Sequence, residues 1–145
     1  MKVYLAGSST GTNRTAVKMA MAGLRGVAGI EVTHDWIASI ERVEAEQGLD
    51  VGLDRDFRRE CAEADLRGVR DADIVWVLIP SEGGAGLWIE LGYALALRDT
   101  FVGRPRPRIL VSPACRRARS IFLDLDAVVL FEEDEDVVSY LRDGR

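Results

Sequence analysis

Apolar and polar positions follow one another along the chain in blocks that predict strands and helices in turn. The clearest strand is the unbroken apolar run from Ile74 to Ile79, which is rich in β-branched residues. Such a run fits a strand that is buried on both faces of a parallel sheet. Pro80 ends the run, and a glycine-containing loop follows before the apolar spacing becomes helical from Leu87. The chain therefore passes here from a buried strand through a glycine loop into a helix.

The same succession of apolar runs and amphipathic stretches continues through the rest of the chain. Further strands are predicted at residues 2–6, 30–33, 108–112 and 127–131. Further helices are predicted at residues 14–25, 37–47, 53–70 and 137–141. This alternation predicts an α/β three-layer sandwich, flavodoxin- or Rossmann-like, with a parallel sheet of about five strands. Since the 145 residues contain no repeat and no interdomain linker, we expect one domain over residues 1–145.

Glu90 is the first candidate for chemistry, because it stands near the start of the helix that follows the glycine loop. Open α/β sheets bind ligands at the carboxyl ends of their strands, so a carboxylate here could act as a nucleophile or a base. The alternative is a surface glutamate favoured by the helix dipole. Asp73 precedes the same strand, about 20 Å away at roughly 3.3 Å per residue. We therefore assign Asp73 to a structural role at the opposite rim.

A second polar loop follows the first predicted strand. Residues 7–13 read Gly-Ser-Ser-Thr-Gly-Thr-Asn and lead into a helix, so free N–H groups and the helix dipole could bind an anion such as phosphate. The alternative is an ordinary turn, with Asn13 as a candidate N-cap. His34, Asp35 and Trp36 follow the next predicted strand and reach the same rim. Trp36 could stack on a base or close the core, and His34 is not expected to be a catalyst.

Composition limits the partners of this protein. The net charge of −5 argues against a general nucleic-acid binder. One histidine and no Cys-x-x-Cys pair argue against a zinc site, and nothing implies a metal or redox cofactor. Cys61 and Cys115 stand in unrelated contexts, which indicates reduced thiols. No apolar run reaches membrane-spanning length, and the residues before the first strand are too few for a signal peptide, so we expect a cytoplasmic protein without a membrane partner.

A cluster of arginines follows the predicted strand at residues 108–112. It could attract phosphate, but a solvated basic face is the favoured interpretation. The cluster consists of Arg116, Arg117 and Arg119.

Three segments together carry a family resemblance. Residues 3–8 read Val-Tyr-Leu-Ala-Gly-Ser, residues 63–75 include Glu-Ala-Asp-Leu-Arg-Gly-Val and Asp-Ala-Asp-Ile-Val, and residues 84–94 read Gly-Ala-Gly-Leu-Trp-Ile-Glu-Leu-Gly-Tyr-Ala. In order and spacing these segments resemble the nucleoside 2-deoxyribosyltransferase family, which includes the 2'-deoxynucleoside 5'-phosphate N-hydrolases. The resemblance covers roughly residues 2 to 112, and the third segment is its most specific part.

The resemblance implies roles for three residues. Glu90 corresponds to the nucleophile that attacks the anomeric carbon of the sugar. Asp65 corresponds to a second carboxylate, which contacts the substrate and is a candidate acid for the departing base. Tyr4 corresponds to a tyrosine whose hydroxyl helps to hold the nucleophile. These roles agree with the chemistry of glycoside cleavage, which needs one ionised carboxylate and a proton for the leaving group.

The substrate pocket is expected around the two loops. Gly7, Ser8, Gly84 and Gly86 would line its sugar–phosphate part, with Asp35 and Trp36 toward the base. Family transferases carry an aspartate for the sugar 5'-hydroxyl six residues before the nucleophile, where this chain has Gly84. The absence of that aspartate favours a 5'-monophosphate, and Arg14 points the same way.

Two departures from the family pattern concern the first loop and the C-terminal region. The first loop lacks the arginine that the phosphate hydrolases place between its serine and its glycine. The asparagine that transferases take from a neighbouring subunit has no clear counterpart, although Asp124 and Asp126 lie in that region. The second departure puts base transfer in question.

We therefore expect an enzyme that cleaves the N-glycosidic bond of a (deoxy)nucleoside or its 5'-monophosphate through a covalent glycosyl-glutamate intermediate. The sugar would pass to water or to a second base. The expected partner is a small nucleoside or nucleotide, and the resemblance implies a homodimer or larger homo-oligomer. One alternative is an NAD-type glycohydrolase, which needs a pocket long enough for a dinucleotide. The other is a non-catalytic nucleotide-binding, sensing module, which would bind a ligand without releasing base.

Overall fold

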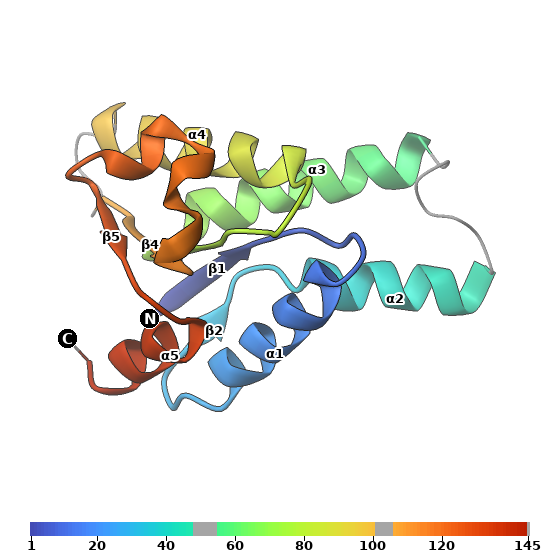
Figure 1. Cartoon of the computed structure of the whole chain (residues 1–145). Helices are drawn as coiled ribbons and strands as arrows, with labels where there is room; N and C mark the ends of the chain where they lie inside the picture. Colours follow the sequence, from blue (N-terminus) through green and yellow to red (C-terminus); the bar gives the residue numbers. More distant parts are fainter. Residues whose placement is uncertain (48–54, 101–105, 145) are drawn as a thin grey trace.

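Parallel strands form the middle layer of the fold (Figure 1). The structure is a computed structural model, and it describes residues 1–47, 55–100 and 106–144. Over these residues the sheet has five strands in the order β2-β1-β3-β4-β5, and every neighbouring pair is parallel. The strands are β1 (Lys2–Ala6), β2 (Glu31–Val32), β3 (Ile74–Leu78), β4 (Arg108–Ser112) and β5 (Val128–Leu130). The predicted parallel sheet is confirmed.

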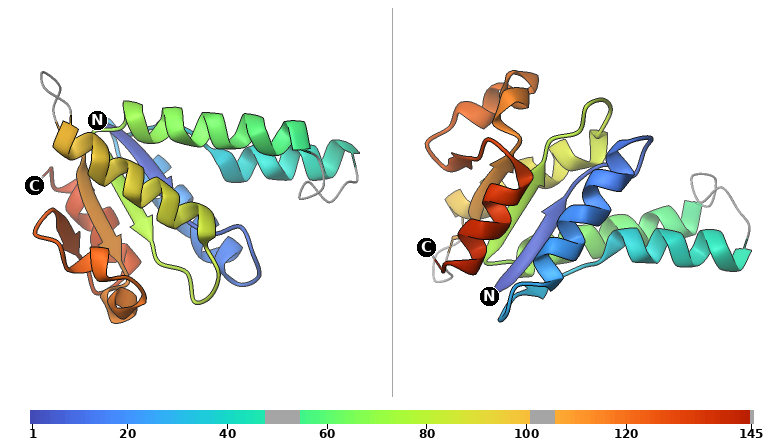
Figure 2. Two further views of the ribbon diagram at one scale, coloured as in Figure 1. Left: turned by 90° about the horizontal axis from the view of Figure 1, so that it is seen from above. Right: turned by 60° about the horizontal axis from the view of Figure 1, so that its bottom comes forward.

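Helices cover both faces of the sheet (Figures 1 and 2). On one face lie α3 and α4, and on the other lie α1 and α5, while α2 runs beside α3 beyond the edge of the sheet (Figure 2). The helices are α1 (Asn13–Arg25), α2 (Trp36–Gln47), α3 (Arg55–Asp71), α4 (Ala85–Thr100) and α5 (Asp134–Arg142). The three-layer α/β sandwich is therefore confirmed. None of the helices in the described part of the chain is long and apolar enough to span a bilayer.

The central strand behaves as its sequence predicts. All of β3 is buried, as expected for a strand with helices on both faces. Its one polar group, the indole N–H of Trp76, donates a 2.8 Å hydrogen bond to Ser112 Oγ on β4. Burial therefore leaves this strand without an unsatisfied side chain.

The observed element boundaries differ from the predicted ones in a few places. The predicted start of α3 at residues 53 and 54 lies outside the described residues. β2 is shorter than predicted, because this edge strand pairs with β1 over only two positions. Two 3₁₀ helices, η1 (Ala114–Arg119) and η2 (Ile121–Asp124), were not predicted, since this stretch has no amphipathic helical period.

The sheet order brings the loops after β1 and β3 together at one edge. From β1 the chain turns toward α1 on one face, and from β3 it turns toward α4 on the other. Such a switch point opens a crevice at the carboxyl ends of the strands. Asn13 joins the two loops there: its amide N–H donates to Glu82 O at 3.1 Å, and its Oδ1 accepts from Ser81 N at 2.9 Å and Ser81 Oγ at 3.0 Å.

Asn13 is therefore not the N-cap that the sequence suggested. Thr12 occupies the N-cap position of α1, and the side chain of Thr12 makes no capping hydrogen bond. The Asn13 side chain is buried, and a buried amide must find partners. The neighbouring loop supplies those partners.

Candidate active site

The site centres on a buried hydrogen bond between β1 and α4. The Tyr4 hydroxyl donates to Glu90 Oε1 at 2.9 Å. Tyr4 is fully buried, and Glu90 is only 9% exposed. A glutamate buried in the first turns of a helix is unusual unless it is paired. The structure thus brings together the two residues that the sequence analysis assigned to the nucleophile and its holder.

Burial changes the protonation of both groups. Desolvation raises the pKa of Glu90 from 4.5 to about 8, the nearby Asp65 charge adds to the rise, and the Tyr4 hydrogen bond opposes it. The pKa of Tyr4 is also raised, first by burial and then by the charges of Glu90 and Asp65. Tyr4 therefore stays a hydrogen-bond donor at any ordinary pH. Glu90 Oε2 is buried and has no hydrogen-bond partner among the described residues.

Asp65 lies beside this pair on α3 and is held by a histidine. His34 Nδ1 is 2.8 Å from Asp65 Oδ1, and the two side chains are 18% and 22% exposed. From the sequence, His34 was not expected to be a catalyst, and its contact with Asp65 was not foreseen. The available signal was its position directly after a predicted strand, on the same rim as the loop after β1.

Gly68 allows α3 to pack closely on these residues. A Cβ built on Gly68 would lie 2.7 Å from Tyr4 Cδ2 and 3.0 Å from His34 Cβ. Both contacts are too short, so the glycine is required for α3 to approach β1. Asp65 stands one helical turn before Gly68, and this approach therefore sets the position of the carboxylate.

We expect Gly68→Ala to lower the free energy of unfolding by about 1–3 kcal/mol, because the added methyl must displace the Tyr4 ring and His34. Gly92→Ala is the matched control, since a Cβ built on this glycine of α4 meets nothing within 4 Å. Helix propensity alone should make that variant about 0.5–1 kcal/mol more stable. Urea denaturation of both variants measures the difference. Equal stability changes would contradict the close packing at Gly68.

A cavity of about 480 Å³ opens next to Asp65. Its walls come from the loop after β1 and from α1, α2 and α3, and they include Ser9, Thr10, Arg14 and Asp65. Hydroxyls, the guanidinium groups of Arg14 and Arg58 and the carboxylate of Glu44 therefore share one cavity with the candidate acid. A second cavity of about 490 Å³ lies between α1 and α5, and none of the predicted site residues lines it.

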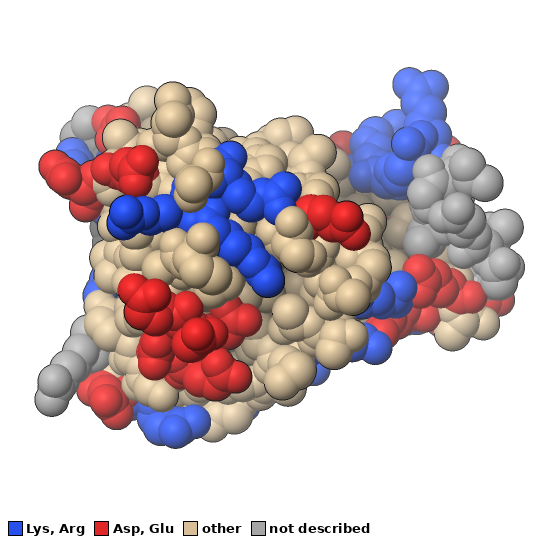
Figure 3. Space-filling model, in the orientation of Figure 1, with Lys and Arg blue, Asp and Glu red and all other residues tan. Residues whose placement is uncertain are grey.

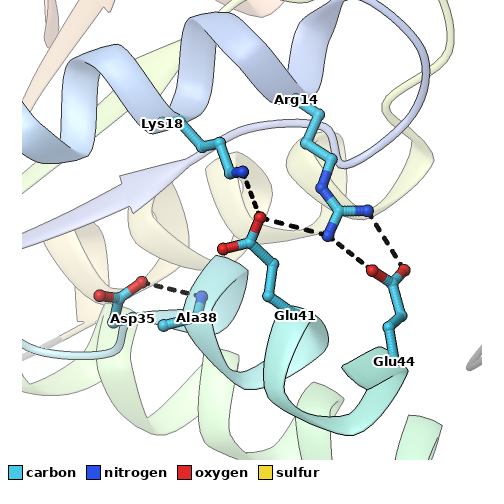
Figure 4. Close-up of polar contacts among 6 residues, drawn as sticks. All are labelled: Arg14, Lys18, Asp35, Ala38, Glu41 and Glu44. Carbon is cyan, nitrogen blue, oxygen red and sulfur yellow. Dashed lines mark hydrogen bonds and ion pairs between the residues drawn. The ribbon is translucent and has the colours of Figure 1, made fainter. Parts of the chain in front are cut away.

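Arg14 is held by α2 (Figure 4). Its guanidinium binds Glu44 through two contacts, of 3.1 and 2.7 Å, and lies 3.5 Å from Glu41 Oε1. Lys18 also pairs with Glu41. These contacts fix the guanidinium at the cavity wall and neutralise part of its charge, which weakens the support that Arg14 gives to a phosphate ligand.

Comparisons with known proteins add information on the fold. No protein-family model matches the chain, and no curated protein matches its sequence. Among solved structures, the chain is similar to the CMP N-glycosidase BcmB of Clostridium botulinum, with a TM-score of 0.51 and 14% sequence identity over 97% of this chain and 98% of that one. A nucleotide N-glycosidase therefore has the same fold over nearly its whole length.

The structure gives a different local environment to each glycine of the predicted pocket and to Ser8. Gly7 is needed for packing, because a Cβ there would lie 2.7 Å from Val17 Cγ2. Ser8 is buried, and its hydroxyl shares a 2.9 Å hydrogen bond with Thr10. Gly84 has a φ of +84°, a conformation that favours glycine. Gly86 faces open space at the start of α4, which leaves room for a ligand.

Asp35 and Trp36, which were predicted for the base side of the pocket, both have partners within the chain. Asp35 caps α2, since its Oδ1 accepts from Ala38 N at 3.2 Å (Figure 4), and it pairs with Arg25. Trp36 is 7% exposed, and its indole N–H donates to Leu5 O at 2.8 Å. Because the indole binds a backbone carbonyl inside the core, Trp36 closes the core. This was the second of the two interpretations offered from the sequence.

The arginine cluster supports the loop after β3. Arg116 donates to Ile79 O at 2.7 Å, and Arg119 donates to Pro80 O at 3.0 Å and to Ser81 O. Figure 3 shows the basic patch over η1, above an acidic patch over the start of α5. Two of the three arginines thus bind backbone carbonyls, a role that the sequence analysis did not consider.

Asp73 has the structural role predicted for it. Its Oδ2 accepts a 2.7 Å hydrogen bond from Lys2 N at the amino end of the central strands, opposite the site. In the described part of the chain, no group of three or more His, Cys, Asp and Glu side chains is placed to hold a metal ion.

Proposed function

We propose that this protein cleaves the N-glycosidic bond of a nucleotide and that Glu90 is the nucleophile. The observation that carries this proposal is the buried Glu90, held by Tyr4 at 2.9 Å and influenced by the charge of Asp65. Two carboxyl groups side by side are the arrangement that glycoside cleavage uses, one as the nucleophile and the other as the acid. The fold shared with a CMP N-glycosidase and the resemblance to the nucleoside 2-deoxyribosyltransferase family support the same chemistry.

In this mechanism ionised Glu90 attacks the anomeric carbon through Oε2. A bond forms between that oxygen and the carbon as the bond from the carbon to the base nitrogen breaks. The two carboxyl groups share one proton, and in the reactive form this proton lies on Asp65 while Glu90 is ionised. Asp65 gives the proton to the departing base, which leaves as a neutral molecule. Water then attacks the anomeric carbon and displaces Glu90 as a carboxylate, while Asp65 accepts the proton that the water loses. A second base in place of water would make the reaction a transfer. Tyr4 donates its hydrogen bond to the other carboxylate oxygen throughout.

A 5'-monophosphate is the favoured substrate. The cavity beside Asp65 contains the hydroxyls of Ser9 and Thr10 and begins at the amino end of α1, which favours negative charge. Gly84 adds no carboxylate that would repel a phosphate. The expected homo-oligomer stays a prediction.

The test is to measure release of free base by chromatography. The protein would be incubated with CMP, dCMP, the other 5'-monophosphates, the matching nucleosides and NAD, each with and without a second free base. We expect release from one or more monophosphates and little from the nucleosides. A new nucleotide formed only with the second base would show transfer, and nicotinamide from NAD would favour the glycohydrolase alternative. Ligand binding without release of any base would contradict the proposal and favour a sensing module.

A further inference from the structure

The hydrogen bond from His34 to Asp65 has no part in the mechanism above, although it joins the chain's only histidine to the candidate acid. We propose that His34 is a positioning residue that holds Asp65 for protonation of the departing base; this inference rests on the proposed function. The observations behind this are the 2.8 Å contact between His34 Nδ1 and Asp65 Oδ1 and the place of Asp65 in the cavity wall.

The side chain of His34 also packs against α3 at its Cβ atom. His34 Cβ would lie 3.0 Å from a Cβ on Gly68, so the backbone of α3 sits directly against it. Both side chains of the pair are mostly buried, at 18% and 22% exposure. An exposed ion pair between flexible side chains contributes little. This pair differs, because one helix, α3, supplies both the acceptor and the surface that holds the donor in place.

The two carboxyl oxygens of Asp65 have different roles in this arrangement. In the tautomer that carries its hydrogen on Nδ1, His34 donates to Asp65 Oδ1, and a proton on Asp65 then lies on Oδ2. When Oδ2–H passes its proton to the base nitrogen, the C–N bond breaks and the negative charge stays on Asp65. The Nδ1–H bond then stabilises that charge, and no proton leaves His34. Any side chain that donates one N–H from the Nδ1 position should therefore replace the histidine.

Two variants of nearly the same shape separate this role from simple packing. His34→Asn keeps an N–H donor close to the Nδ1 position, whereas His34→Leu has a methyl group there. A hydrogen bond to a charged group contributes about 1.5–3 kcal/mol, so we expect His34→Leu to lower kcat by about 10- to 100-fold with KM changed less than about threefold. His34→Asn should stay within about threefold of the wild type. His34→Gln, whose amide mimics the Nε2 position, should behave like the leucine variant, and it replaces that variant if the leucine protein does not fold.

The same substitution made in a variant without the Asp65 carboxylate shows whether His34 acts through Asp65. In Asp65→Ala protein, His34→Leu should change kcat by less than about twofold, because the carboxylate it supports is gone. Equal activities of the Asn and Leu variants, or an undiminished effect of His34→Leu without Asp65, would overturn the inference while leaving the proposed function intact. Absence of base release from wild-type protein would instead overturn the proposed function and this role together. Thermal melts of every variant accompany the kinetics.

Discussion

Glu90→Gln is expected to lower kcat/KM for base release by at least about 1,000-fold. Glutamine keeps the size of the side chain and an oxygen that can accept from Tyr4, so the packing of β1 on α4 should survive. It cannot form an ester with the anomeric carbon, because an amide is a poor nucleophile and carries no charge. The loss should therefore appear in the chemical step, while substrate binding changes little. Single-turnover assays with the best monophosphate of the substrate panel, together with binding by calorimetry, measure the two effects.

The control for this experiment is Glu63→Gln, which removes an exposed carboxylate on α3, two residues before Asp65. Its activity should match that of the wild type. Intact-protein mass spectrometry of acid-quenched wild type should detect the added sugar phosphate, and the Glu90→Gln protein should show none. If Glu90→Gln kept activity close to the wild type, the nucleophile assignment would be wrong, and a water-mediated mechanism with Asp65 as base would need to be considered.

The central part of this site could be predicted because its signals are local. The apolar run of β3 fixes a buried strand, the glycines mark a loop, and Glu90 follows at the start of a helix. Parallel strands end at one edge, so Glu90 and the loop after β1 could be placed on the same rim from the order of the elements alone. The Tyr4–Glu90 contact, by contrast, spans 86 positions and came from the family resemblance.

Three contacts that were not foreseen depend on partners distant in sequence. Asn13 looked like a helix cap but binds a loop 68 positions later. Arg14 looked free but is held by Glu44, 30 positions away. His34 was placed on the rim of the site, but its partner Asp65 lies 31 positions later. A pattern of apolar and polar positions tells which face of an element is inward, but not which polar groups of two elements meet.

Wild-type protein is expected to lose stability relative to Glu90→Gln as the pH rises from 5 to 9. The pKa of Glu90 is about 8 in the folded protein and ordinarily 4.5, so the native state binds the proton more tightly than the unfolded chain. The stabilisation that this proton provides is complete below pH 4.5 and is lost as the pH rises through 8. At 1.36 kcal/mol per pKa unit the loss amounts to about 4–5 kcal/mol. Glutamine does not titrate and should show none of it.

Urea denaturation of the two proteins at pH 5, 7 and 9 measures this difference. Other groups titrate in the same range, including Asp134, whose pKa is also raised by burial, but their contributions cancel when the two proteins are compared at each pH. Glu63→Gln should follow the wild type throughout. A difference between wild type and Glu90→Gln that stays constant with pH would mean that the native state does not hold the extra proton. If the difference in the free energy of unfolding grows with pH, ionisation of Glu90 weakens the fold. Nucleophilic attack needs the same ionisation, so part of the stability of the fold is given up to place a reactive carboxylate in the core.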